Sequence, residues 1–257
     1  MGKRTNSNSN SDETESNKKA KLYIEAIEKA EKEEFDEIDN ITDNKKDTKD
    51  TKNSENDTDK NNKDIEIIEI KEEKEKTEKD KMIMGETYNY NDPQLIKERI
   101  ECRKLLKKIN DSEPEEFDKR LDCFKKLFKK FGDQSYIEPP FRCDYGSNIS
   151  IGKKCSINFN LTILDCTYVT IGDNCLIGPD CKIIAVTHPL IEREFEKELT
   201  LPVKIGDDCF IGAGSIILPG VTIGDKVVIG AGSVVSTNIE SNSIVSGNPA
   251  KVVGKTK

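Results

Sequence analysis

The feature that most constrains the fold is a period of six residues that governs the chain after Ile149. Aliphatic residues recur at this spacing, with a two-residue slip after Ile163 and a longer interruption after Ile183. The positions are Ile151, Ile157, Ile163, Ile171, Ile177, Ile183, Ile205, Ile211, Ile217, Ile223, Ile229 and Val235. Such repetition is typical of a parallel β-helix, in which coils stack on one another and the aliphatic side chain points inward.

Small residues occupy two further positions of the repeat. Glycine directly follows many of the aliphatic residues, and we expect it at corners that need special backbone angles: Gly152, Gly172, Gly178, Gly206, Gly212, Gly224 and Gly230. The fourth residue after each anchor is small: Cys155, Cys175, Cys181, Cys209, Ser215, Val221, Val227 and Ser233. A buried thiol behaves as a small hydrophobe, so these cysteines are predicted to be structural.

Two amphipathic helices are predicted ahead of the repeat. Asp92-Pro93 is a typical helix start, and apolar residues follow it at helical spacing as far as Ile109. A second apolar stripe covers residues 117–131 and predicts a helix that ends at Gly132. The two helices would form a hairpin that buries its apolar stripes on another surface.

The N-terminal third of the chain has the composition of a disordered tail. The first 80 residues hold 25 Asp and Glu against 17 Lys and Arg, so the net charge of −8 lies in this part. Few apolar residues are present to offset the entropy of ordering. We therefore predict a disordered acidic tail over residues 1–77, a helical segment over 78–134 and a β-helix domain over 135–257. The tail could be a solvated extension or an arm that binds a partner, and the sequence leaves that partner unknown.

Several classes of protein are not expected. No run of 18 apolar residues is present, so we expect no membrane-spanning helix. The start Met1-Gly2-Lys3-Arg4 lacks the apolar core of a signal peptide, so the eight cysteines are expected to be reduced thiols in the cytoplasm. Without a CxxC pair no metal site is expected. The folded part is neutral overall and follows an acidic tail, so the charge distribution does not indicate binding to nucleic acid.

His188 is the only histidine of the chain, and it stands where the repeat breaks. It precedes Pro189 and an insertion over residues 189–204, and solenoids place function in such extruded segments. Acyl transfer from a thioester to a hydroxyl needs a base, because an alcohol is a poor nucleophile at neutral pH. Histidine is the side chain suited to this task near pH 7, so His188 is the candidate general base.

Short motifs along the chain point to a known family. They are Lys81-Met82-Ile83-Met84-Gly85-Glu86-Thr87-Tyr88, Ile137-Glu138-Pro139-Pro140-Phe141-Arg142-Cys143-Asp144-Tyr145-Gly146, Asn158-Phe159-Asn160, Ile171-Gly172-Asp173-Asn174, Thr187-His188-Pro189, Ile211-Gly212-Ala213-Gly214 and Gly247-Asn248-Pro249-Ala250. From about residue 78 onward the chain resembles the maltose and galactoside O-acetyltransferases among the hexapeptide-repeat acyltransferases. The resemblance implies a mainly β protein, a left-handed parallel β-helix with a short N-terminal helical hairpin, that acts as a homotrimer. It also implies acetyl transfer from acetyl-CoA to a hydroxyl of a mono- or disaccharide.

The resemblance also assigns roles to single residues. His188 would take the proton of the sugar hydroxyl, and the backbone N–H of Ala213 would meet the developing oxyanion. Asn158 would share in catalysis or contact the acceptor. The remaining acceptor-binding residues would be Asp144, Tyr90, Asp92 and Cys166. From the residues alone, Asp144 and Asn158 could equally be turn formers at coil corners.

Coenzyme A would lie between neighbouring subunits. The family positions that contact it are matched here by Ala213, Ala231, Ser236, Thr237, Lys251 and Gly254. Glycine at 212, 214, 230 and 232 would let the pantetheine arm approach the backbone closely. Lys251 and Gly254 stand where galactoside enzymes carry Arg, and Tyr90 and Cys166 where they carry Asp. These departures favour the maltose-type subgroup and leave the acceptor open.

Three other functions fit parts of the sequence. A γ-class carbonic anhydrase shares the fold but needs three histidines around a metal, which one His cannot supply. An acyltransferase of the same superfamily with a non-sugar or amino-sugar acceptor remains open, as one scaffold hosts many substrates. A non-catalytic trimeric β-helix platform also remains open, although it would have no use for His188 beside a CoA groove.

Overall fold

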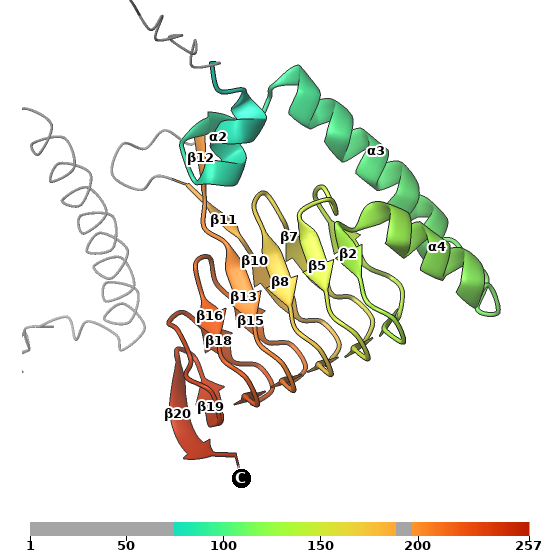
Figure 1. Cartoon of the computed structure of the whole chain (residues 1–257). Coiled ribbons are helices and arrows are strands. Elements are labelled where there is room, and N and C mark those ends of the chain that lie inside the picture. Colours follow the sequence, from blue (N-terminus) through green and yellow to red (C-terminus); the bar gives the residue numbers. More distant parts are fainter. Residues whose placement is uncertain (1–74, 189–196, 257) are drawn as a thin grey trace, which may run out of the picture. The chain divides into compact units, whose positions relative to one another are not determined.

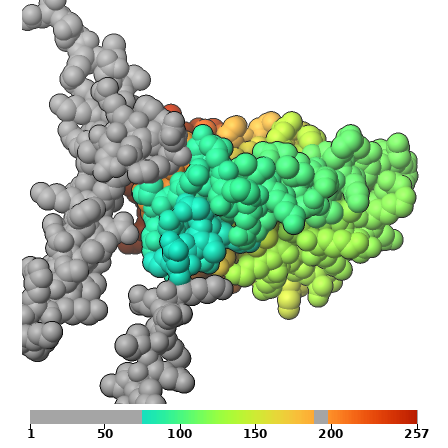
Figure 2. Space-filling model, turned by 90° about the horizontal axis from the view of Figure 1, so that it is seen from above, coloured from blue at the N-terminus to red at the C-terminus, as the bar shows by residue number. Residues whose placement is uncertain are grey.

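The computed structural model describes residues 75–188 and 197–256, and this part of the chain is mainly β (Figure 1). The described residues belong to one unit, Glu72–Lys257. The disordered tail predicted over residues 1–77 lies outside them, apart from its last three residues. Figure 2 views this unit from above, where α2 (Glu78–Met84) and α3 (Pro93–Asn110) form one surface over the coils.

Five coils stack in the described part, and each contributes one short strand to each of three parallel sheets. Face 1 holds β2 (Lys130–Phe131), β5 (Ile149–Ile151), β8 (Val169–Ile171), β13 (Val203–Ile205) and β16 (Thr222–Ile223). Face 2 holds β3 (Tyr136–Ile137), β6 (Ser156–Ile157), β9 (Leu176–Ile177), β14 (Phe210–Ile211) and β17 (Val228–Ile229), then β19 (Ser243–Gly247) and the antiparallel β20 (Ala250–Lys255). Face 3 holds β4 (Arg142–Cys143), β7 (Thr162–Leu164), β10 (Lys182–Ile184), β15 (Ile216–Ile217) and β18 (Val234–Val235). The predicted parallel β-helix is confirmed.

The core is built from the predicted six-residue anchors. Ile151, Ile171 and Ile205 pair with one another in successive coils of face 1, and the anchors of the other faces form equivalent ladders. All of them are buried, and a fully buried aliphatic side chain contributes roughly 2 kcal/mol. The small corner residues are buried too. The thiols of Cys155, Cys175, Cys181 and Cys209 each lie 3.0–3.3 Å from a glycine carbonyl oxygen of the next coil.

The glycines of the repeat serve a different purpose from the one predicted. None of the seven that follow an anchor has a left-handed backbone, so the expectation of special angles is wrong. They are required because adjacent coils come close. A Cβ atom on Gly172 would lie 2.6 Å from the carbonyl carbon of Gly206, and one on Gly206 would lie 2.7 Å from that of Gly224.

The β-helix begins earlier than the sequence indicated. The second hairpin helix, α4 (Phe117–Leu127), ends at Leu127, so its predicted extension to Phe131 is wrong. Phe131, Ile137 and Cys143 pair with the anchors of the second coil and form the first one. They keep the six-residue period, but Phe and Cys replace aliphatic residues, and pairing with a neighbouring coil overrides the helical pattern.

The helical segment covers the end of the first coil. Asp92 caps α3 as predicted, since its carboxylate accepts from the backbone N–H of Gln94 at 2.9 Å. Phe124 and Phe128 pack edge-on against Phe141 of the first coil, with ring centroids 5.9 and 5.5 Å apart. None of the described helices is long and apolar enough to span a membrane.

The insertion after the third coil is partly a strand. β11 (Val186–Thr187) and β12 (Lys197–Thr200) pair antiparallel, and β12 also pairs with β1 (Tyr88–Asn89) of the N-terminal segment. Leu201 N–H donates to Ala185 O at 3.2 Å, so the chain leaves and rejoins the coil at one corner. The segment predicted as a loop over residues 189–204 therefore ends in a strand that ties it to residues more than a hundred positions earlier.

Candidate functional site

A second apolar cluster lies apart from the core of the β-helix, where α2, the start of α3 and the insertion meet. Its buried members are Met82, Tyr88, Leu95, Tyr145 and Cys166, and Tyr90 and Val186 pack against them. The structure therefore brings together Tyr90 and Cys166, two of the residues predicted to bind the acceptor. Figure 1 shows α2 beside β12 at this place.

Two carboxylates meet at the thiol of Cys166. Its Sγ lies 3.9 Å from Asp144 Oδ2 and 3.9 Å from Glu198 Oε2. Asp144 was predicted here, whereas Glu198 was not. Glu198 also accepts a short hydrogen bond from the hydroxyl of Tyr88, its partner in the β1–β12 pair. Because this contact joins distant segments, no periodicity could have indicated it.

Burial governs the charge of the carboxyl groups. It raises the pKa of Asp144, and the negative charge of Glu198 adds to the rise while Arg103 and Arg99 oppose it. Burial also raises the pKa of Asp165 to about 7. Asp165 Oδ1 accepts from the backbone N–H of Asp144 and of Tyr145, both at 3.0 Å, and so fixes the corner that carries Asp144. Its buried Oδ2 has no hydrogen-bond partner in the described part of the chain.

Arg99 holds the N-terminal segment against this corner. Its guanidinium donates to the hydroxyl of Tyr145 at 2.6 Å and to the carbonyl of Tyr90 at 2.7 Å. Asp92 is part of the same segment, but its Oδ1 is used by the cap of α3. The structure gives Asp92 a role in the helix, and its contact with an acceptor stays a prediction.

His188 is exposed and directly follows β11. The ladder pairs Val186 with Thr200 and Thr187 with Leu199, so its next rung would set His188 opposite Glu198. Side chains alternate along a strand, so His188 shares a face with Val186, which packs against the second apolar cluster described above. This register therefore places the candidate base next to Glu198, whose carboxylate meets that of Asp144 at the thiol of Cys166.

A second group of predicted residues lies at the corner between face 2 and face 3. Asn158 follows β6, Ala213 follows β14 and Ala231 follows β17, and all three are exposed. Within the described ranges, the backbone N–H groups of Ala213 and Ala231 make no hydrogen bond. Two exposed donors on adjacent coils, roughly 4.8 Å apart, can meet a carbonyl oxygen or an oxyanion.

The glycines at this corner fall into two kinds. Gly214 and Gly232 have a left-handed backbone, and a Cβ atom on either would meet nothing within 4 Å. These two can lie against a pantetheine arm as predicted. A Cβ atom on Gly212 would lie 2.5 Å from Ala231 N, and one on Gly230 would lie 2.7 Å from Ser246 Oγ. Gly212 and Gly230 are therefore required mainly because adjacent coils stack closely at these positions.

The remaining predicted residues lie at the C-terminal end. Ser236 and Thr237 follow β18, and Lys251 and Gly254 belong to β20. Lys251 is exposed and can reach a phosphate, whereas Gly254 lies half-buried opposite Ile244.

The two groups of site residues lie at different corners. Asp144, Cys166 and the start of the insertion are at the corner between face 3 and face 1, and Asn158, Ala213 and Ala231 are at the other end of face 3. Face 3 separates them by on the order of 15 Å, given about 3.3 Å per extended residue. One chain therefore does not bring Asn158 to its own His188.

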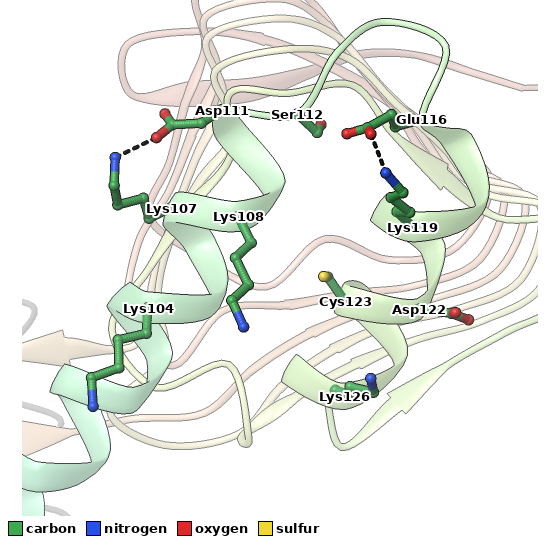
Figure 3. A pocket seen from close by; sticks show the side chains of 10 residues that line it. All are labelled: Lys104, Lys107, Lys108, Asp111, Ser112, Glu116, Lys119, Asp122, Cys123 and Lys126. Carbon is green, nitrogen blue, oxygen red and sulfur yellow. Dashed lines mark hydrogen bonds and ion pairs between the residues drawn. The ribbon is translucent and has the colours of Figure 1, made fainter.

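A groove between α3 and α4 is a different feature (Figure 3). It has a volume of about 820 Å³ and is lined by Lys104, Lys107, Lys108, Asp111, Ser112, Glu116, Lys119, Asp122, Cys123 and Lys126. None of the predicted site residues is among them. Lys107 pairs with Asp111 and Lys119 with Glu116, so much of its charge is neutralised. In the described ranges, no group of three or more His, Cys, Asp or Glu side chains could hold a metal ion.

Coils with a six-residue period, a helical cap and a histidine at the start of an extruded insertion define a hexapeptide-repeat acyltransferase. The profile of the maltose acetyltransferase hexapeptide capping motif matches residues 81–132, and that of the hexapeptide repeat of succinyl-transferase matches residues 168–187 and 202–237. Nodulation protein L of Rhizobium meliloti is 44% identical over 177 residues, with 68% of this chain and 97% of the relative covered.

Solved structures agree with these matches. A maltose O-acetyltransferase from Clostridium difficile 630 is 43% identical, with a TM-score of 0.70, 71% of this chain and 98% of that chain covered. A galactoside acetyltransferase in complex with coenzyme A is 37% identical, with a TM-score of 0.69. The match covers 71% of this chain and 92% of that chain. The chain belongs to the maltose and galactoside O-acetyltransferase family, and it is an acetyltransferase.

Proposed function

We propose that the protein transfers the acetyl group of acetyl-CoA to a hydroxyl of a mono- or disaccharide, with His188 as general base. The observation that carries this proposal is the position of His188. It is exposed, and the β11–β12 register continued by one rung sets it opposite Glu198, whose carboxylate meets that of Asp144 at the thiol of Cys166. Carboxylates accept hydrogen bonds from sugar hydroxyls, and a base beside them can take the proton of the hydroxyl that reacts.

The reaction would proceed by direct transfer. The imidazole of His188 takes the hydroxyl proton while the oxygen attacks the acetyl carbonyl carbon. The backbone N–H of Ala213 stabilises the oxyanion of the tetrahedral intermediate. As the intermediate collapses, the C–S bond breaks and the imidazolium returns its proton to the thiolate of CoA.

Coenzyme A would lie along the corner of Ala213 and Ala231. The open faces of Gly214 and Gly232 leave room for the pantetheine arm. Ser236, Thr237 and Lys251 would hold the nucleotide end, next to the backbone of Gly254. A hexapeptide-repeat acetyltransferase of Vibrio cholerae complexed with acetyl coenzyme A, 34% identical at a TM-score of 0.67, supports this choice of donor.

The active form would be a homotrimer, because the site needs residues from two corners of the prism. Face 2 offers a contact surface, since its outward positions Leu176, Phe210, Val228 and Ile244 form one apolar ladder. Leu176 and Phe210 are 50% and 45% exposed in the single chain. All eight cysteines are free thiols, as expected for a protein of the cytoplasm.

The first test compares the wild-type protein with His188→Ala. Release of CoA from acetyl-CoA is measured on glucose, maltose, galactosides and amino sugars. We expect a sugar-dependent rate that falls by about a hundredfold or more in the variant. Equal thermal unfolding and equal CoA binding are the controls. Full activity of His188→Ala would exclude the proposed base, and wild-type inactivity on every sugar would exclude the proposed acceptor class.

The second test asks whether two chains share one site. Asn158→Ala and His188→Ala are each expected to be weakly active, and are then co-expressed. In randomly mixed trimers, about a quarter of the sites would combine an intact His188 with an intact Asn158 of the next chain. Recovery of about a quarter of wild-type activity is the expected result. A mixture no more active than its parts would contradict the shared site.

A further inference from the structure

We propose that Glu198 is a specificity-determining residue, which accepts a hydrogen bond from an acceptor hydroxyl next to the one that is acetylated. This inference rests on the proposed function and extends it to the choice of acceptor. Neither the six-residue period nor the sequence motifs single out Glu198. Its assignment comes from strand register and from its contacts with Tyr88 and Cys166.

Register places Glu198 in the middle of a row across three strands. Tyr88 of β1 is its direct partner on one side. On the other side, the β11–β12 ladder continued by one rung sets His188 opposite it. Directly opposed side chains share a face with Cβ atoms about 4.5–5.5 Å apart. A hydroxyl that reaches His188 therefore has its ring neighbours close to Glu198.

The contacts of Glu198 leave one oxygen available. Oε2 accepts from the hydroxyl of Tyr88 and lies near the thiol of Cys166. Oε1 has no hydrogen-bond partner in residues 75–188 and 197–256. Tyr88, only 1% exposed, fixes the orientation of the carboxylate. A fixed carboxylate with one oxygen that no described residue uses is suited to accept from a ligand donor.

Asp144 provides a second acceptor across the thiol. Both carboxylate oxygens lie 3.9 Å from the same sulfur, so they are at most twice that distance apart. Two carboxylates this close can hold two hydroxyls of one sugar ring. They also repel an acceptor that carries its own carboxylate or phosphate beside the reactive hydroxyl, although the positive charges of Arg103 and Arg99 offset part of this repulsion at Asp144. The pair of carboxylates therefore favours neutral, hydroxyl-rich acceptors.

The test uses Glu198→Gln, which keeps the shape of the side chain and an acceptor for Tyr88. The acceptor is the most active sugar of the panel, together with its deoxy analogues at each position next to the acetylated hydroxyl. A hydrogen bond to a charged group corresponds to about ten- to hundredfold in affinity. We expect Glu198→Gln and Glu198→Ala to raise the acceptor KM by that factor. The KM for acetyl-CoA and kcat should stay within about threefold.

One deoxy analogue should identify the hydroxyl bound by Glu198. For the wild-type protein, the KM for that analogue should exceed the KM for the parent sugar by about the factor by which Glu198→Ala raises the KM for the parent sugar. For Glu198→Ala, the KM for that analogue and for the parent sugar should differ little. Relative to the parent sugar, the matching uronic acid should become a better substrate of Glu198→Gln. Glu240→Gln is the matched control, because Glu240 is exposed and pairs only loosely with Lys255 at 3.9 Å.

Four outcomes overturn the inference. If replacement of Glu198 raised the acceptor KM by the same factor for the parent sugar and for every deoxy analogue, Glu198 would bind no hydroxyl. A loss confined to kcat or to thermal stability would show that it only holds Tyr88. Wild-type inactivity on every sugar would remove the inference together with the proposed function. An active wild type with unchanged Glu198 variants would remove the inference alone.

Discussion

Replacing Gly172 by Ala tests the close approach of the third and fourth coils. The new Cβ atom would lie 2.6 and 2.7 Å from the carbonyl carbon and oxygen of Gly206, and 2.2 Å from Asp207 Oδ1. Ordinary contact is about 3.5–4 Å, so the coils must separate by about 1 Å at this corner. Overpacking of this kind costs about 1–3 kcal/mol. The bond from Asp173 N–H to Asp207 Oδ1, 2.7 Å long, would also be lost, at about 1–2 kcal/mol.

We therefore expect Gly172→Ala to lower the free energy of unfolding by about 2–5 kcal/mol. Gly232→Ala is the matched control, since a Cβ there meets nothing and only the left-handed backbone is strained, at about 1 kcal/mol. Urea unfolding followed by circular dichroism at one protein concentration measures both. A Gly172→Ala variant no less stable than Gly232→Ala would refute the argument from coil spacing.

Three further predictions concern single polar residues. Because burial raises the pKa of Asp165 from 3.8 to about 7, the folded chain holds that proton and stability falls as pH rises between these values. In Asp165→Asn this fall should be absent. Relative to the wild type, the free energy of unfolding of the variant should therefore be about 2–4 kcal/mol higher at pH 8 than at pH 4, measured by urea unfolding across pH. Asp92→Ala should lose about 1 kcal/mol of stability with the cap of α3, whereas Asp92→Asn should keep the cap and, if Asp92 contacts the acceptor, raise only the acceptor KM. Lys251→Ala should raise the KM for acetyl-CoA about fivefold, the effect of one exposed charge, and leave the acceptor KM unchanged.

The six-residue period predicted the fold well because it follows from the geometry of stacking. Each anchor pairs with the anchor of the next coil, so one register places all of them inside. The first coil was not predicted, because Phe131 and Cys143 replace the aliphatic residues that mark the repeat. The role of the glycines was also misjudged, since close approach between coils is invisible until the register is known.

The site was only partly accessible from the sequence. The resemblance located His188, Asn158 and Asp144, each of which lies in a short motif. It did not reveal that His188 and Asn158 lie at different corners, because that depends on which face each strand joins. Glu198 was missed because its position depends on pairing with Tyr88, 110 residues away.

The division between repeat and insertion predicts how this site can change. The proposed CoA-binding residues Ala213 and Ala231 are at coil corners, where Gly212 and Gly230 permit stacking, so we expect substitutions there to alter the fold as well as the proposed CoA binding. Glu198 lies in the insertion, outside the coils, and its main contacts are with Tyr88 and the thiol of Cys166. Because the coil core does not depend on Glu198, we expect a substitution there to change the proposed acceptor choice at little cost in stability. Acceptor specificity should therefore vary more easily than donor specificity on this scaffold.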